Sequence, residues 1–119
     1  MGARPAYLTI SNFTGNTLSK GSDDVEHGKY VKNPPDKVVR SEEFEVSAKD
    51  GALIGPKGWV EYAVEGTSVV YRLFWNHPYG SATSAYTVEI KNDEREEYHY
   101  KINGDPERHE QHMDYELYK

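Results

Sequence analysis

Along most of the chain, apolar residues alternate with polar residues at a period near two, and β-branched and aromatic types dominate the apolar positions. This alternation is typical of strands that bury one face and expose the other to water. The strand patterns are not interleaved with helical ones, so a parallel sheet built from strand-helix-strand units is not expected. The pattern predicts an all-β protein.

A β-hairpin is the clearest predicted unit. Two strand-like runs, 59–64 and 67–75, flank the dipeptide Glu65-Gly66. Short hairpin turns require positive φ, and glycine adopts positive φ without steric cost. We therefore expect two neighbouring antiparallel strands here.

Further strands are expected wherever the period of two returns, at 7–10, 38–46, 86–90 and 98–102. Residues 19–36 are rich in Gly, Pro, Asp and Lys and show no sustained period, which predicts a long exposed loop. Short strands separated by turn residues at regular spacing favour an antiparallel β-sandwich, in which two sheets bury their apolar faces against each other.

The C-terminal tail, 105–119, leaves two structures open. Asp105 is a suitable cap for a short helix with Pro106 at its first position and Glu107 in its first turn. A charged edge strand is the alternative, and the helix is slightly favoured.

Composition narrows the class of protein. A length of 119 residues is typical of one domain, so the sequence predicts a single domain, 1–119. The formal net charge of −6 argues against a nucleic-acid partner. Only 36% of residues are hydrophobic, but ten are tyrosines, which predicts a thin, aromatic-rich core. The chain has no cysteine, which excludes disulfides and thiolate chemistry.

The apolar runs are much shorter than the roughly 20 residues of a membrane-spanning helix. The first ten residues, MGARPAYLTI, lack the apolar centre of a signal peptide. We therefore expect a protein made in soluble form in the cytoplasm, without a cleaved leader.

No residue pattern supports catalysis or metal binding. His109 and His112 are three residues apart and invite a metal interpretation, but the segment is not H-E-x-x-H, and a solvated tail explains it better. A G-x-S-x-G elbow, a P-loop and a dinucleotide fingerprint are all absent from the sequence. The sequence predicts a non-enzymatic protein without cofactor or metal.

An aromatic strand that runs into a turn, residues 71–81, is the most informative segment. Its sequence is YRLFWNHPYGS. Aromatic rings with a polar group suit a membrane-water boundary or a partner surface. By alternation, Arg72 and Phe74 take the face opposite to Trp75, and Arg72 indicates the side that meets water. Trp75 and Tyr79, with Tyr86 in the next strand, are predicted contact residues, and a place in the core is the alternative for the strand positions.

The order of several motifs resembles the aegerolysin family, in particular its bacterial branch and the small component of binary insecticidal crystal toxins. The motifs are ISNFTGNTL at 10–18, HGKY at 27–30, GPKGWVEY at 55–62, FWNHPYGS at 74–81 and YTV at 86–88. The resemblance covers about 7–103 and does not extend into the tail.

The resemblance implies a β-sandwich of the aegerolysin or actinoporin type and a function in membrane-lipid or receptor binding. It also implies one component of a two-part cytolytic or insecticidal pore-forming toxin, with a larger partner protein and assembly into oligomers on target-cell membranes. A crystal inclusion is then the alternative to the cytoplasm as the place where the protein is made. Lys29 and Tyr30 become secondary contact candidates. The alternative function is a carbohydrate- or protein-binding module without lytic activity.

Overall fold

The computed structural model describes residues 4–80 and 83–119, and it is built from strands throughout these ranges. The first three residues of the segment searched for a leader, and Ser81 of the aromatic turn, lie outside them. The elements are β1 (Ala6–Phe13), β2 (Leu18–His27), β3 (Lys29–Lys32), β4 (Lys37–Val38), β5 (Ser41–Ser47), β6 (Lys57–Val64), β7 (Val70–Asn76), β8 (Ala85–Lys91), β9 (His99–Asn103) and β10 (Gln111–Tyr118).

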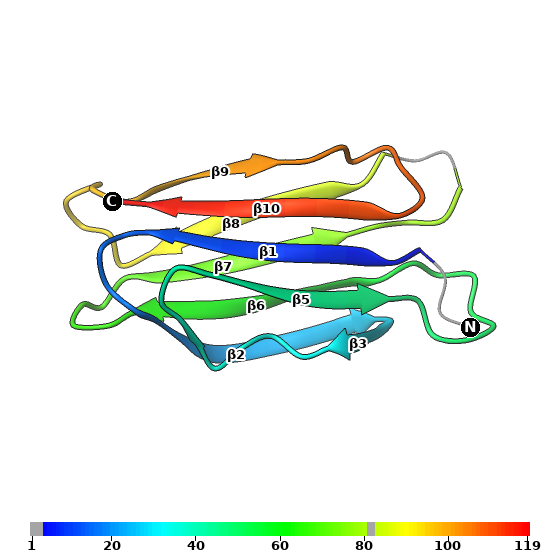
Figure 1. Ribbon diagram of the computed structural model, residues 1–119, viewed down its shortest axis with the longest axis horizontal. Coiled ribbons are helices and arrows are strands. Elements are labelled where there is room, and N and C mark those ends of the chain that lie inside the picture. Colours follow the sequence, from blue (N-terminus) through cyan, green and yellow to red (C-terminus); the bar gives the residue numbers. More distant parts are fainter. Residues whose placement is uncertain (1–3, 81–82) are drawn as a thin grey trace.

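Two five-stranded sheets pack face to face (Figure 1). Sheet A has the order β3-β5-β1-β10-β9, and sheet B has the order β4-β2-β6-β7-β8. All pairings are antiparallel except that of β1 with β10, which makes sheet A mixed. The predicted β-sandwich is confirmed, with this one parallel pair as the departure from a purely antiparallel fold.

The predicted hairpin is present as β6 and β7, with Trp59 opposite Phe74 and Tyr62 opposite Tyr71. Gly66 adopts a φ of +82° in the connection, the conformation for which a glycine is needed. The predicted alternation in β7 is also confirmed: Tyr71, Leu73 and Trp75 are buried, whereas Arg72 and Phe74 lie on the outer face.

Two sequence-based predictions of local structure are wrong. Residues 19–36 form most of β2, all of β3 and a short link, not a long loop. The period of two is obscured here because β2 carries register shifts and buries only one of its ten residues. The C-terminal tail is neither a helix nor an edge strand, because β10 lies inside sheet A between β1 and β9.

Buried tyrosines join the two sheets and form much of the core. Tyr115 of sheet A donates a 2.6 Å hydrogen bond to the carbonyl of Phe74 in sheet B. Tyr71 of sheet B donates a 2.8 Å hydrogen bond to the carbonyl of Tyr118 in sheet A. A buried tyrosine is stable when its ring is packed and its hydroxyl has a partner. The expected aromatic-rich core is therefore present, and the hydroxyl groups of these two tyrosines are satisfied.

Candidate functional site

Several connecting segments meet at one end of the sandwich, the end at which β1 begins (Figure 1). We call it the loop end; it consists of 48–56, 77–80, 83–84 and 104–110. Backbone hydrogen bonds connect these segments, from His77 to the carbonyl of Pro56 at 2.9 Å and from Ser84 to that of Pro106 at 3.1 Å. Loops placed on a rigid scaffold are the usual carriers of binding residues.

Two adjacent aliphatic side chains project from the loop end. Leu53 is 82% exposed and Ile54 is 55% exposed. The next residue, Gly55, lies so close to the chain at His77 that an added Cβ would be 1.8 Å from the His77 carbonyl oxygen. This contact holds one side of the loop against the sandwich and leaves Leu53 and Ile54 in water. A neighbouring pair of exposed aliphatic residues is a candidate interaction site.

Tyr79, a predicted contact residue, lies on the neighbouring loop and is half-buried. The Arg4 guanidinium lies 5.6 Å from its ring centroid and donates a hydrogen bond to the carbonyl of Pro78. Because Gly55 packs against Pro78, the loop of Tyr79 and the loop of Leu53 are direct neighbours. The loop end thus combines aliphatic side chains with an amphipathic aromatic ring.

A buried histidine fixes the arrangement of these loops. His77 is fully buried; its Nδ1 lies 2.8 Å from the Ser84 hydroxyl and its Nε2 lies 2.6 Å from the His109 carbonyl. A carbonyl only accepts, so Nε2 carries the proton and Nδ1 accepts from Ser84. Burial lowers the pKa of His77, which keeps the ring neutral in this network.

Gln111, also buried, extends the same network from the first residue of β10. Its amide nitrogen donates to the Ser84 hydroxyl at 2.9 Å and to the carbonyls of Pro106 and Arg108 at 2.8 Å each. Tyr86 donates its hydroxyl hydrogen to the Gln111 side-chain oxygen, and burial raises the pKa of that hydroxyl. Tyr86 is therefore a half-buried structural support next to the loop end, with its polar group already engaged.

Trp75 lies in the core and does not present its ring to a membrane. Its side chain is 1% exposed, and its ring centroid lies 5.6 Å from that of Phe44 and 6.1 Å from that of Tyr30. The alternation of β7 directs it inward, so the core alternative applies to this residue.

The secondary candidates, Lys29 and Tyr30, lie on β3 and not on a loop. Tyr30 is half-buried and donates a 2.7 Å hydrogen bond to the Asp23 carboxylate, and burial is the largest cause of its raised pKa. Lys29 is 3.5 Å from the carboxylate of Asp50, a residue of the loop end. The structure thus brings Lys29 and Tyr79 to the same end of the sandwich and places Tyr30 beneath it.

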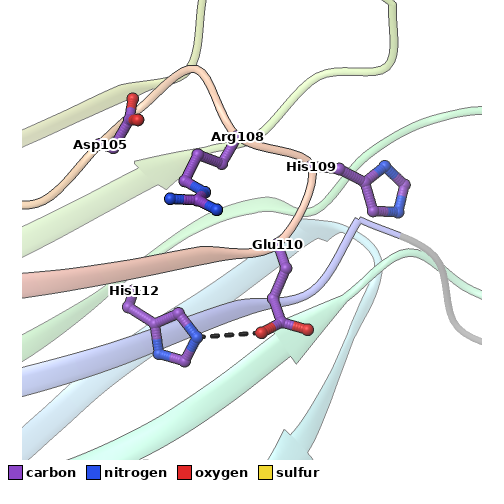
Figure 2. Close-up of a pocket in the computed structure, with 5 residues that line it drawn as sticks. All are labelled: Asp105, Arg108, His109, Glu110 and His112. Atoms are coloured by element: carbon purple, nitrogen blue, oxygen red, sulfur yellow. Dashed lines mark hydrogen bonds and ion pairs between the residues drawn. The ribbon is translucent and has the colours of Figure 1, made fainter.

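A depression of about 570 Å³ opens beside β10 and is lined by ionisable side chains, among them Asp105 and Arg108 (Figure 2). His112 and Glu110 form a 3.0 Å contact there, whereas the ring of His109 points to the opposite side. The two histidines therefore do not converge. Within 4–80 and 83–119, no three side chains of the His, Cys, Asp or Glu type gather as a metal site would require.

Sequence reasoning missed the exposed aliphatic pair of the loop end. Leu53 and Ile54 lie in a Gly-rich connection without a period, and only their adjacency between glycines signals an unusual loop. No motif indicated the network of His77 and Gln111, because it depends on backbone carbonyls of other segments. In the described part of the chain there is no helix with the length and apolar character to span a bilayer.

The fold is shared with proteins of known structure. The lipid-binding protein Nakanori superimposes with a TM-score of 0.81 at 15% identity, over 100% of this chain and 72% of its own. IP-1A from Alcaligenes faecalis gives 0.73 at 14% identity, over 98% and 91% of the two chains. The RahU protein, solved with a TRIS molecule, gives 0.74 at 12% identity, over 98% and 95%.

No family model matches the sequence, and no curated protein matches it. At identities of 12 to 15%, the structural likeness defines the fold of this chain as the β-sandwich of these proteins.

Proposed function

We propose that this protein is a non-enzymatic lipid-binding protein that attaches to membrane surfaces through its loop end. The observation that carries the proposal is the pair of exposed aliphatic side chains, Leu53 and Ile54, beside the half-buried ring of Tyr79. Aliphatic tips enter the apolar boundary of a bilayer, and tyrosine suits its headgroup level. The likeness to a lipid-binding protein at a TM-score of 0.81 supports this choice of ligand.

Charge indicates which lipids are suitable. The net charge of −6 opposes attraction to anionic leaflets, whose surface potential is negative. Binding therefore depends on apolar insertion and hydrogen bonds to headgroups, and neutral or zwitterionic lipids are the expected targets.

The more specific proposal is an aegerolysin-like component of a two-part cytolytic or insecticidal toxin. In this scheme the chain recognises a target-cell membrane or receptor, and a larger partner protein forms the pore, with oligomers assembled on the membrane. The motif order in 7–103 supports it. Dye release from vesicles tests it: the chain alone should bind but cause no release, and efficient release by the chain alone would contradict the two-part scheme.

The double variant Leu53→Ser/Ile54→Ser tests the membrane contact. Each buried aliphatic side chain contributes about 1.5 to 3 kcal/mol, so vesicle affinity should fall at least about tenfold. The measurement is co-sedimentation with phosphatidylcholine vesicles. Val39→Ser is the matched control, because Val39 is 66% exposed and precedes β5 at the opposite end of the sandwich.

Equal loss of binding in the control and the double variant would contradict a contact through the loop end. Absence of any vesicle binding by the unmodified chain would contradict lipid binding itself.

A further inference from the structure

Arg4 is a partly exposed cation next to the loop end, two residues before β1 begins. Within 4–80 and 83–119, no carboxylate forms an ion pair with it. A guanidinium keeps its charge at every physiological pH, and a charge that is partly removed from water is normally compensated by an opposite charge. The positive charge of Arg4 is therefore available to an anion from outside the chain.

Three contacts hold the Arg4 guanidinium in a defined place. One terminal nitrogen donates to the carbonyl of Pro78, and the other lies 3.3 Å from Nδ1 of His109. The ring centroid of Tyr79 is 5.6 Å away. These contacts form although Arg4 adopts a φ of +58°, a backbone conformation that residues with a side chain rarely occupy. A side chain that is already fixed loses less conformational entropy when a ligand binds to it.

The guanidinium keeps N–H groups that these contacts do not use. It has five N–H groups, of which Pro78 and His109 each engage one. The Nε N–H is buried and has no partner among the described residues, so a ligand does not reach it. Two further N–H groups remain on the terminal nitrogens, and the contact with His109 lies at the exposed side of the group. Arginine N–H groups are well suited to phosphate oxygens.

Pro78 connects this cation to the exposed aliphatic pair. Its carbonyl accepts from Arg4, and its Cα would lie only 3.1 Å from a Cβ added to Gly55. Gly55 directly follows Leu53 and Ile54 in the chain. When these two side chains enter the apolar boundary of a bilayer, a cation next to their loop lies at the level of the headgroups. In a phospholipid, the phosphate lies at that level.

The net charge of the protein selects among phosphate-bearing lipids. A charge of −6 opposes approach to leaflets with a negative surface potential. A zwitterionic phospholipid offers a phosphate oxygen to Arg4 without giving the leaflet a net charge. Uncharged lipids without phosphate offer the guanidinium no anion.

We propose that Arg4 binds the phosphodiester group of a zwitterionic phospholipid while Leu53 and Ile54 enter the bilayer. This inference rests on the proposed membrane function and adds the headgroup class to it. Arg108 is the natural control, because it is exposed and lies in the polar depression, on the side of its segment away from the His109 ring (Figure 2).

Co-sedimentation with two kinds of vesicle tests the proposal. Phosphatidylcholine carries the phosphate, whereas digalactosyldiacylglycerol is an uncharged bilayer lipid without it. The unmodified chain should bind phosphatidylcholine about tenfold more tightly, and Arg4→Gln should lower that affinity to the level measured on digalactosyldiacylglycerol. Arg108→Gln makes the same change in net charge and should bind both kinds of vesicle as the unmodified chain does.

Three results would overturn the role of Arg4 and leave the membrane function standing. Equal affinity of the unmodified chain for the two lipids would mean that phosphate is not recognised. An equal loss on both lipids in Arg4→Gln would reduce Arg4 to a support of the loop end. An equal loss on phosphatidylcholine in Arg4→Gln and Arg108→Gln would indicate a general charge effect. Absence of binding to either kind of vesicle by the unmodified chain would instead contradict the membrane function itself.

Soluble probes separate a lipid headgroup from free phosphate. In NMR spectra of the nitrogen-labelled chain, glycerophosphocholine should shift the Arg4 signals in a saturable way, and inorganic phosphate should do so only at higher concentration. In Arg4→Gln, the signals of the neighbouring Tyr79 should no longer respond to glycerophosphocholine. Tighter binding of inorganic phosphate would replace the headgroup by free phosphate, and no shift with either probe would contradict a phosphate site.

Discussion

The outer faces of the two sheets differ in how they handle charge. On sheet B, the Glu61 carboxylate receives both Arg72 and Lys91 at 2.8 Å, so its charge is compensated locally. On sheet A, the outward carboxylates of β5 and β10 make no ion pair within the described ranges; they are Glu43, Glu45, Asp114 and Glu116.

The carboxylates of sheet A affect the ionisation of Tyr7 in β1. Its pKa is raised, first by the charge of Glu45, which lies opposite in the sheet, and then by burial and the charges of Glu110 and Glu43. Because the outward carboxylates of β5 and β10 have no ion-pair partner, we expect an anionic surface to repel sheet A more strongly than sheet B. The difference teaches that the compensation of charge is not the same on the two faces.

The largest expected effect tests how differently aromatic residues of the two sheets contribute to stability. Trp75→Ala removes a fully buried ring of sheet B and should lower the free energy of unfolding by about 3 to 5 kcal/mol. Phe13→Ala, on the outer face of sheet A, removes a ring that is 54% exposed and stacked on Tyr118, and should change it by less than about 0.5 kcal/mol. Urea unfolding measures both, and equal losses would contradict the assigned burial.

An intermediate effect concerns the charge cluster of sheet B. Glu61→Gln removes the shared acceptor of Arg72 and Lys91 and should cost about 1 kcal/mol at pH 7. Burial opposes ionisation of Glu61, but hydrogen bonds and charges from Lys91 and Arg72 outweigh it and hold the pKa below its ordinary value of 4.5. The stabilisation is therefore present above about pH 4.5 and is lost as the pH falls through the lower folded-state value.

Urea unfolding at pH 7 and about pH 3 checks this prediction, because the difference between Glu61→Gln and the unmodified chain should shrink in acid. Glu45→Gln on sheet A is the control; it relieves repulsion and should leave stability at pH 7 unchanged or slightly higher. If Glu45→Gln lowered the free energy of unfolding as much as Glu61→Gln does, the proposed difference in charge compensation between the two faces would be contradicted.

The smallest effect tests whether sheet A orients the molecule at a membrane. A variant with Gln or Asn at the four carboxylates of sheet A should bind phosphatidylserine-containing vesicles about threefold more tightly at low salt, and less so at high salt. Binding to pure phosphatidylcholine should not change. A gain of the same size on both vesicle types would show that charge on sheet A does not act through the surface potential.

The strands that could be predicted from the sequence are those whose two faces meet different environments. Trp59 to Trp75 shows a clean period of two because β6 and β7 lie inside sheet B with one face in water. Strand β10 has the same period of two, with Gln111, Met113, Tyr115 and Leu117 buried. Its outward residues are mostly charged, and for this reason the segment was not recognised as a buried strand. In β2, register shifts and broad exposure left no pattern to find.

The candidate site could be predicted only in part. The alternation of apolar and polar residues indicates which side of a strand is exposed, but it does not indicate which residues of a turn are exposed. Tyr79 was within reach of sequence reasoning, since its turn interrupts an aromatic strand. The prominence of Leu53 and Ile54 depends on the contact of Gly55 with the chain at His77. This contact is a distance between two segments that are separate in the chain.

The sequence by itself determined that the chain forms strands, buries tyrosines and carries excess negative charge, because periodicity, ring size and ionisation are local properties. Tertiary structure alone decided which strand lies beside which, including the parallel pairing of β1 with β10. It also decided that the unpaired carboxylates of β5 and β10 lie on sheet A and that Leu53 and Ile54 project together from the loop end. The physical reason is that packing two sheets sets the distances on which exposure, charge compensation and hydrogen-bond satisfaction depend.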